Sequence, residues 1–584
     1  MQRLFKAKRP ALAAVLGILL TAVSAGFAGQ DERWVVAPEV NALDDFNVMP
    51  NSTALAKLMT EAAEYAQRWR LPVDAADWWQ RRDRLERVVL RGLGLDPLPE
   101  RTPMNVRITG RHDMGDYTIE NVIFDSRPGF PVTANLYRPK TASPGMRPAV
   151  LCPIGHSLDE GKAEKFYQAR CIKLARLGFV VLIYDAIGHG ERCVPGNSHH
   201  EAGFALLPSG QTVLGFMVWD SMRGIDFLQS LPDVDPDCIG VTGNSGGGLN
   251  TLFTTALDRR VKCGALAGYV YQSSNWIKYS GPNCTCCFVP GLYREMDWFE
   301  IAGLAAPRAL LMMQGDEDYI FPISGARKAG RATEALYGLL GYRDRARFDE
   351  FHGWPHGYWQ PFREAMYGWM LYHLMGQGDG SPLAEGDVRP LEPDDPRLLC
   401  DKDGSAMAAA QSAVELAGEL AARKVNSLPV EASKSKTAAV RRLAAGLAAP
   451  PERESHYLMP MVFDSLETAN GVLEKVYFLS EIGQYIPGLL WLPGSAEAPY
   501  RTVIAVDDRG KAAVAGSGLV EPLLERGCAV LSVDLRGRGE TLGRIGAERD
   551  NNFNFATLSV MWGRPAAGAR AFDLKRTVDF VAGR

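Results

Sequence analysis

The chain has 584 residues, 46% of them hydrophobic, and a formal net charge of −4 at pH 7. This length predicts more than one domain, each with an apolar core. The near-neutral charge, with no long basic run after the first ten residues, argues against nucleic acid as a partner. Ten cysteines in so long a chain exclude a small disulfide-rich fold.

Residues 1–28 have the pattern of an export signal. Basic residues precede an apolar stretch from Ala11 to Val23, and small residues continue to Ala28. The apolar stretch is too short to span a membrane, and no later stretch reaches 18 apolar residues. We therefore expect a periplasmic or extracellular protein without a stable membrane anchor. An uncleaved N-terminal anchor is the alternative.

Two different periodicities follow. Residues 29–104 include an amphipathic helical stretch at 50–95, in which Trp78 and Trp79 are expected to pack onto the main body. Residues 105–140 alternate apolar and polar positions, which predicts antiparallel strands. Apolar strands then alternate with helices. The strands are predicted at residues 149–153, 179–185, 238–242, 261–267, 309–314 and 345–351. The helices are predicted at residues 161–177, 216–231, 246–257, 324–340 and 361–375. Residues 105–375 therefore predict an α/β domain in which helices cover both faces of a mostly parallel sheet.

The remaining chain repeats part of this domain. Residues 376–455 are expected to be a linker followed by an Ala-rich helical segment. Beyond them, Gly161-Lys162-Ala163 recurs as Gly510-Lys511-Ala512, and five further residues recur at the same offset of 349 (Gly178, Asp185, Gly188, Gly190 and Glu191, as Gly527, Asp534, Gly537, Gly539 and Glu540). We interpret residues 456–584 as an incomplete second copy that ends before a counterpart of residue 245. Its open sheet edge favours association.

The most informative motif is Gly243-Asn244-Ser245-Gly246-Gly247, between a predicted strand and a predicted helix. A serine on a sharp strand-to-helix turn exposes its hydroxyl, and the flanking glycines leave room for the turn. A bland Gly-rich loop is the alternative. In this context the motif predicts that Ser245 is a nucleophile.

A serine nucleophile needs a base and an acid that orients the base, and with this kind of turn both follow it in the chain. Asp318 is the expected acid, because it lies a few residues beyond the strand at 309–314, and Asp316 is the second choice. His356, between Pro355 and Gly357 in a loop after the last strand, is the expected base, and His352 is the second choice.

The oxyanion of an acyl-transfer intermediate needs two preorganised N–H donors. The Gly246 N–H, at a helix N-terminus, is the first expected donor. The second is expected in the loop after the strand at 149–153, where His156 N–H fits best. The His156 side chain is also a candidate substrate contact.

Several of these residues form a familiar set: Ser126-Arg127-Pro128-Gly129 with Asn135-Leu136-Tyr137, Gly155-His156, Tyr184-Asp185 with Gly188-His189-Gly190-Glu191-Arg192, the Ser245 turn and Pro355-His356-Gly357. With them the chain resembles the α/β-hydrolase superfamily over about residues 50–375. More narrowly, it resembles bacterial secreted acetyl xylan esterases and dienelactone-hydrolase-like esterases. The resemblance implies a serine esterase in which Ser245, Asp318 and His356 form the triad.

Residues 268–306 are the expected lid. Aromatic residues there, Tyr271 and Trp276 in particular, are candidate sugar-stacking side chains, although a hydrophobic cap is the alternative. The same segment contains Cys284-Thr285-Cys286-Cys287. Oxidation of part of this cluster is one interpretation. A metal site is disfavoured, because no second Cys or His pair stands at a recognisable ligand spacing.

Three functions compete. The first is a secreted serine carboxylesterase that cleaves short-chain, acetyl-type esters, on small molecules or on acetylated plant polysaccharide, and needs no metal or organic cofactor. The second is a serine peptidase of the oligopeptidase type, although no blade-length repeats indicate a propeller. The third is a non-catalytic scaffold that acts through the second copy. The sequence leaves the oligomeric state open.

Overall fold

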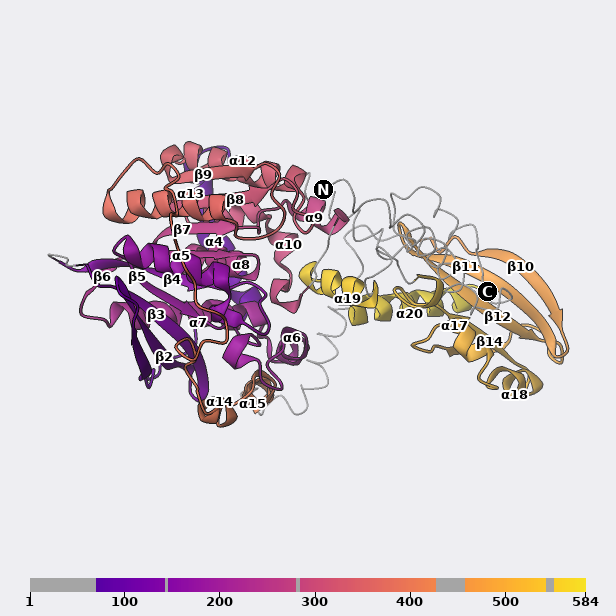
Figure 1. The fold of residues 1–584 in the computed structure, drawn as a ribbon. Helices are drawn as coiled ribbons and strands as arrows, with labels where there is room; N and C mark the ends of the chain where they lie inside the picture. Colours follow the sequence, from indigo (N-terminus) through magenta and orange to yellow (C-terminus); the bar gives the residue numbers. More distant parts are fainter. Residues whose placement is uncertain (1–69, 142–144, 280–283, 427–456, 542–550) are drawn as a thin grey trace, which may run out of the picture. The chain divides into compact units, whose positions relative to one another are not determined.

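The computed structural model describes residues 70–141, 145–279, 284–426, 457–541 and 551–584 (Figure 1). They fall into two compact units. One contains the described residues of Met59–Ser435 and Thr557–Gly563, and the other contains those of Lys436–Ala556 and Arg564–Arg584. The expected export signal at residues 1–28 and part of the expected Ala-rich segment, residues 427–448, lie outside the described residues.

The first helix among the described residues, α4 (Ala75–Leu93), lies within the helical stretch expected at 50–95, and residues 50–69 of that stretch are outside the described residues. The Asp74 side chain caps its N-terminus by accepting a hydrogen bond from Asp77 N at 2.8 Å, and Gly94 ends it in the left-handed conformation. Trp78 is fully buried, as expected. Trp79 is 41% exposed, so the expectation that both tryptophans pack inward is wrong for Trp79.

A nine-stranded sheet forms the centre of the first unit, in the order β1-β2-β3-β5-β4-β6-β7-β8-β9. The first strands, up to the β3–β5 pair, are antiparallel, and all later pairs are parallel. The strands are β1 (Arg107–Asp113), β2 (Tyr117–Arg127), β3 (Phe130–Pro139), β4 (Arg147–Pro153), β5 (Val180–Tyr184), β6 (Val234–Asn244), β7 (Val261–Ala267), β8 (Ala309–Gly315) and β9 (Ala346–Phe351). The predicted α/β fold with a mostly parallel sheet is therefore present.

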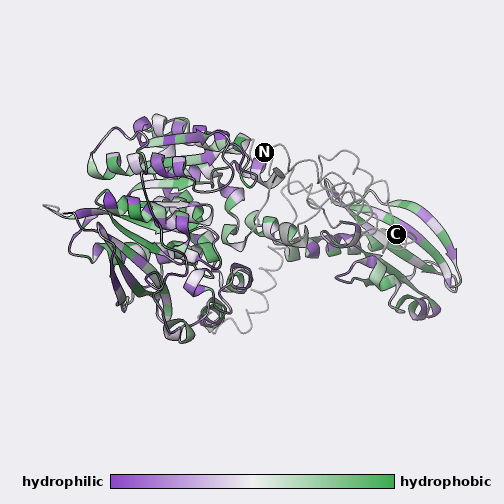
Figure 2. Cartoon of the chain, in the orientation of Figure 1, coloured by the Kyte–Doolittle hydropathy of each residue, from purple (hydrophilic) through white to green (hydrophobic). Residues whose placement is uncertain are grey.

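Side chains alternate between two cores, because successive residues of a strand point to opposite faces of a sheet. Val150 and Cys152 of β4 belong to one core, together with residues of α5 (Lys165–Arg176) and α13 (Gln360–Met370). Ala149 and Leu151 belong to the other, together with residues of α7 (Val213–Gln229). Both faces are thus covered, and Figure 2 shows the central strands mostly in the hydrophobic colour.

Two helices start at other residues than the sequence predicted, because polar side chains cap their N-termini. The helix expected at 161–177 is a 3-10 turn, Gly161–Ala163, followed by α5, whose N-terminus is capped by the Glu164 carboxylate. Helix α7 starts three residues early, since the Thr212 hydroxyl accepts a hydrogen bond from Gly215 N at 3.0 Å. The last helix becomes a π-helix at Leu371–Met375.

Residues 376–403, expected to be a linker, are irregular but pack on the first unit. Glu385 is 7% exposed and forms a bidentate ion pair with Arg363 of α13, at 2.5 and 2.6 Å. Leu398 and Cys400 are buried as well. The polar composition of this segment did not indicate such packing, because composition does not reveal a buried pairing partner. Helices α14 (Ser405–Ala408) and α15 (Ala413–Asn426) follow.

The second unit contains a five-stranded sheet in the order β10-β11-β12-β14-β13. Its strands are β10 (Met461–Thr468), β11 (Gly471–Glu481), β12 (Gln484–Pro493), β13 (Arg501–Ala505) and β14 (Cys528–Val533). The order and the parallel or antiparallel sense of each pair equal those of β1-β2-β3-β5-β4. The described C-terminal residues also form helices α17 (Lys511–Ala515), α18 (Val520–Glu525), α19 (Asn551–Met561) and α20 (Ala566–Ala582), and a 3-10 turn at Gly539–Thr541.

The recurring residues form the same ion-pair cluster in both units. Lys162 Nζ lies 2.7 Å from Asp185 Oδ2 and also pairs with Glu191. Lys511 Nζ lies 2.7 Å from Asp534 Oδ2 and also pairs with Glu540. An origin by duplication remains a prediction, because shared topology and contacts demonstrate likeness rather than descent.

Among the described residues, no single helix has the length and apolar composition for a membrane span, and one pair bent by 95°, His199–Ser209 with Val213–Gln229, meets that test by length and composition alone.

Candidate active site

Ser245 occupies the turn between β6 and helix α8 (Gly246–Leu257) in a backbone conformation that L-residues rarely adopt, with φ 53° and ψ −123°. Its N–H donates to Ala267 O at 2.9 Å, which fixes the turn against β7. The flanking glycines are required sterically, because a Cβ at Gly243 would lie 2.4 Å from Gly247 O, and one at Gly247 would lie 2.5 Å from Pro153 O. The sequence therefore produces a strained serine at the carboxyl end of the sheet.

His356 and Asp318 form a buried pair on neighbouring loops. His356 Nδ1 lies 2.7 Å from Asp318 Oδ2, and the two side chains are 14% and 1% exposed. Three further donors hold the carboxylate: Gln314 Nε2 at 2.6 Å, Ile320 N at 2.8 Å and Phe321 N at 3.0 Å. A carboxylate held this firmly orients the imidazole and leaves Nε2 to face a reacting group.

The second-choice acid and base also pair with each other, but on the surface. Asp316 Oδ2 lies 3.0 Å from His352 Nδ1, and the His352 side chain is 78% exposed. Hydrogen bonds from His352 and from Gly353 N hold the pKa of Asp316 below its ordinary value. Neither residue lines the cavity that contains Ser245.

Ser245 and His356 line one cavity of about 490 Å³, together with residues of the loops after β4, β8 and β9 (the other lining residues are His156, Phe166, Tyr167, Asn244, Cys284, Ile320, Gly357, Tyr358, Trp359 and Arg363). His356 Nε2 is buried and has no hydrogen-bond partner among the described residues. The structure therefore places Ser245 and His356 in one cavity, with Asp318 hydrogen-bonded to His356, and the triad roles of the three residues stay a prediction.

The loop after β4 lies against the serine turn. A Cβ at Gly155 would lie 3.2 Å from Ser245 Cβ, and one at Gly246 would lie 3.4 Å from the His156 ring. Gly155 N donates to Tyr167 Oη at 2.6 Å, and the buried Arg170 guanidinium donates to Pro153 O at 2.9 Å. Gly246 is the first residue of α8, so its N–H has no intrahelical acceptor. The two expected oxyanion donors thus belong to adjacent segments.

Comparison with known proteins accords with this geometry. No family model matches the chain. A protein of Bacillus subtilis (strain 168), named "Putative hydrolase YtaP", is 31% identical over 264 residues, which span 43% of this chain and 86% of the relative. The chain belongs to the α/β-hydrolase superfamily.

One further relative of this α/β-hydrolase, and one solved structure of similar fold, carry esterase names. A protein of Schizophyllum commune, named 4-O-methyl-glucuronoyl methylesterase, is 28% identical over 180 residues, which span 26% of this chain and 45% of the relative. The solved structure named Methylesterase BT1017 has a TM-score of 0.50 at 22% identity and covers 66% of this chain and 81% of that one. The latter likeness shows a shared fold.

The structure does not bring Tyr271 and Trp276 to the cavity of the hydrolase. They are 3% and 0% exposed, and both rings stack on Phe321, with centroids 5.6 and 6.1 Å apart. The expectation of sugar-stacking residues is therefore wrong for this pair. The hydrophobic cap was the alternative, and a segment with so many aromatics buries them because burial of each ring is favourable.

Other aromatic residues do line the cavity of this hydrolase. Trp359 is 39% exposed, and its Nε1 donates to Pro355 O at 2.9 Å, which fixes the indole beside the loop of the base. Tyr358 is buried, and its hydroxyl lies 2.5 Å from Thr242 Oγ1. The sequence could have indicated Tyr358 and Trp359 as residues that line the cavity, because both directly follow Pro355-His356-Gly357.

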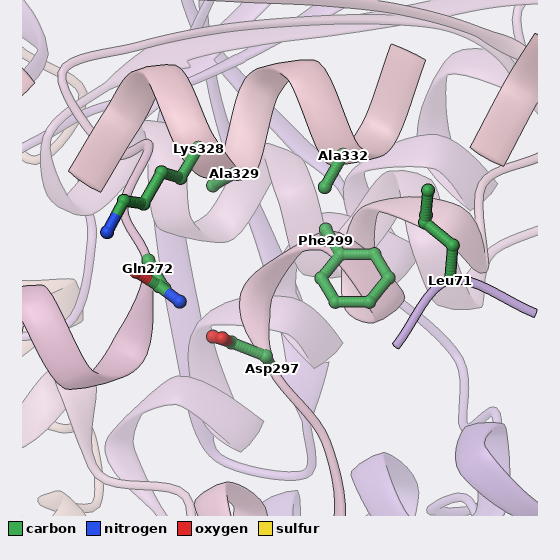
Figure 3. A pocket seen from close by; sticks show the side chains of 7 residues that line it. All are labelled: Leu71, Gln272, Asp297, Phe299, Lys328, Ala329 and Ala332. Atoms are coloured by element: carbon green, nitrogen blue, oxygen red, sulfur yellow. The ribbon is translucent and has the colours of Figure 1, made fainter. Parts of the chain in front are cut away.

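A second, smaller cavity of about 140 Å³ lies elsewhere in the hydrolase unit (Figure 3). Figure 3 shows Leu71 and Phe299 on one side and Gln272 and Lys328 on the other. The Asp297 carboxylate there is already engaged by Ser273 N at 2.9 Å and Trp298 N at 2.7 Å. Its lining contains no serine or histidine.

Proposed function

We propose that the chain is an exported serine carboxylesterase that removes short acyl groups from carbohydrate esters through an acyl-enzyme. The observation that carries the proposal is the shared cavity of Ser245, on its strained turn, and His356, whose Nδ1 is held by Asp318 at 2.7 Å. The esterase names of one relative and of one solved structure support an ester as the substrate class. None of the relatives described above carries a peptidase name, and the intact site disfavours a scaffold for this unit.

The geometry of the site supports the following proposed roles. His356 Nε2 accepts the proton of Ser245 Oγ as this oxygen attacks the ester carbonyl. The carbonyl oxygen becomes an oxyanion between the N–H groups of Gly246 and His156, and loss of one such donor typically costs about 3 kcal/mol of transition-state stabilisation. His356 then protonates the leaving alcohol. A water molecule, deprotonated by the same imidazole, attacks the acyl-enzyme and releases the acid.

The cavity supports a small acyl group joined to a larger alcohol. A volume of about 490 Å³ lies within the usual range of small-molecule sites. The partly exposed indole of Trp359 at its margin is suited to stack on a sugar ring. We therefore assign the acetyl-type group to the interior and the sugar to the side of Trp359.

The esterase is tested with acetylated xylan, with an aryl acetate and with the Ser245→Ala variant. We expect release of acetate by the wild-type protein and its loss in Ser245→Ala, while the variant keeps the wild-type circular dichroism spectrum. Equal turnover in both proteins would overturn the proposal.

A second candidate, in the same mechanistic class, is a methylesterase that acts on a sugar acid. The names of the Schizophyllum commune relative and of the solved neighbour favour it. In that reaction the sugar supplies the acyl part and methanol leaves. Comparison of kcat/KM on a methyl glucuronate ester and on acetylated xylan separates the two, because each assigns the opposite part of the ester to the sugar.

Export is part of the proposal and rests on residues 1–28 alone. N-terminal sequencing of the protein recovered from the periplasm or the medium tests it. A mature N-terminus near residue 29 supports export, and retention of Met1 on cytoplasmic protein contradicts it.

A further inference from the structure

Two histidines and two cysteines meet at the wall of the active-site cavity. His156 comes from the loop after β4, His199 begins helix α6 (His199–Leu206), and Cys284 and Cys286 belong to the segment between β7 and β8 that is expected to be the lid. One potential ligand atom from each of the four lies within 4.8 Å of all the others. His199 Nδ1 lies 3.2 Å from Cys284 Sγ, and His156 Nε2 lies 3.5 Å from Cys286 Sγ.

Two of these separations approach those between the ligands of a tetrahedral ion with two nitrogen and two sulfur ligands. With Zn–S near 2.3 Å and Zn–N near 2.05 Å, the edges of such a tetrahedron measure about 3.3 to 3.8 Å. The two nearest N–S pairs, at 3.2 and 3.5 Å, are already close to these edges. We propose that His156, His199, Cys284 and Cys286 bind one zinc ion.

The surroundings fit a metal better than a set of hydrogen bonds. Cys286 and His199 are buried, and a thiol is a weak donor and a weak acceptor. His199 Nδ1 is the ring nitrogen that faces Cys284 Sγ, and His156 Nε2 faces Cys286 Sγ. A cation held by these two nitrogens and both sulfurs would replace weak thiol hydrogen bonds with metal–ligand bonds.

The lid turn is held in the position that this site requires. Thr285 Oγ1 donates to His199 O, which ties the 3-10 turn Thr285–Cys287 to the start of α6. The 3-10 turn and α6 also pack closely: a Cβ at Gly203 of α6 would lie 2.3 Å from Thr285 Cβ. The protein therefore places Cys284, Cys286 and His199 together without the metal, and His156 completes the set.

The ion would join the lid to the serine turn. His156 belongs to the loop that provides the proposed second oxyanion donor, and its ring faces Gly246. Cys284 and His156 both line the cavity with Ser245. Zinc at this place fixes the His156 loop and the lid relative to α8, so the site positions the oxyanion donors and takes no part in bond making.

Metal analysis of the full chain tests the site independently of activity. We expect one zinc per chain, retained through dialysis, in the wild-type protein and in Ser245→Ala, and loss of most of it in Cys284→Ser/Cys286→Ser and in His199→Asn. Cys193→Ser and His200→Asn are matched controls at exposed positions, and we expect both to keep the metal.

The wild-type protein alone supplies a second measurement, in case a variant fails to fold. Co²⁺ added to the metal-free chain should give the strong visible bands of a tetrahedral ion and a thiolate-to-cobalt charge-transfer band, and Zn²⁺ should abolish both. Absence of these bands, a disulfide between Cys284 and Cys286 in the purified protein, or full zinc content in the double variant would each overturn the proposal. Because Ser245→Ala is inactive yet expected to hold zinc, failure of the metal site and failure of the esterase are distinguishable.

Discussion

The Asp318 carboxylate contacts His356 Nδ1 at 2.7 Å and is held from behind by Gln314 and by two backbone N–H groups. A second acid–histidine pair, Asp316 with His352, has nearly the same separation only a few residues away. Distance therefore does not distinguish the two pairs. Burial and the shared cavity with Ser245 do, and they favour His356 as the proposed general base.

The first prediction uses these two pairs as test and control. Asp318→Asn should lower kcat by about 10³- to 10⁴-fold, because the amide no longer holds the imidazole in the correct tautomer. Asp316→Asn should leave kcat within about twofold, since surface pairs contribute little. Steady-state kinetics on an aryl acetate measures both. A large loss in Asp316→Asn alone would transfer the role to the exposed pair.

The second prediction concerns Gly268, which lies beside the base. Its φ is +59°, and a Cβ there would lie 3.1 Å from His356 Cε1 and 3.7 Å from Asp318 Oδ2. Gly268→Ala should lower kcat about 10- to 100-fold, because a small displacement of a catalytic group is costly.

Gly353→Ala is the matched control. Gly353 also has a positive φ, +75°, but a Cβ there would meet nothing within 4 Å. Both variants carry the backbone strain of alanine in this conformation, about 1 kcal/mol, whereas only Gly268→Ala displaces the imidazole. If the two variants lose the same activity, strain rather than contact with His356 is the cause.

The third prediction separates the two units. Lys162→Met removes the cation from buried Asp185 and Glu191, and Lys511→Met does the same to Asp534 and Glu540. Breaking such a buried pair typically costs about 3 to 5 kcal/mol. Calorimetry of the full chain should show that each variant lowers a different unfolding transition. A shift of the same transition by both variants would indicate that the units unfold as one.

The fourth prediction concerns pH and rests on His373 in the π-helix after α13. Burial, and then the charge of Arg345, lower the pKa of His373 to about 4 from its ordinary value of 6.5. Between these two values the unfolded chain binds more protons than the folded chain, so the free energy of unfolding falls as the pH falls. The stability that the protein has with a neutral His373 is therefore fully present above pH 6.5 and is lost progressively as the pH falls towards 4.

Urea unfolding at pH 7 and at pH 5 measures this effect. The wild-type protein should lose stability with a slope of at most about 1.4 kcal/mol per pH unit from this residue, and less because the ring is partly exposed. His373→Gln should show a smaller difference between the two pH values. His200→Gln, at an exposed position, should behave as the wild type, and equal differences in all three proteins would contradict the assignment.

Much of the fold was predictable because local patterns and global structure agree. The strand at 261–267 and the helix at 246–257 have the expected bounds, since apolar runs and the Gly-rich turn delimit them. The expected serine and base also line one cavity, and the expected acid pairs with the base. The sequence could not show which side chains are covered by a distant part of the chain, because the local pattern is the same with or without a covering partner. The exposure of Trp79 and the packing of residues 376–403 were therefore not predicted.

The order of chemistry-bearing residues along the chain was set by the sequence alone: a serine on a Gly-rich turn, then an acid, then a histidine, each after an apolar strand. Which residues become neighbours across the fold was decided only by the tertiary structure. It buries Tyr271 and Trp276 away from the cavity, and it joins His156 and His199 to Cys284 and Cys286. Local spacing cannot show such a cluster, because its members come from three segments that meet only when parallel strands bring their carboxyl ends together.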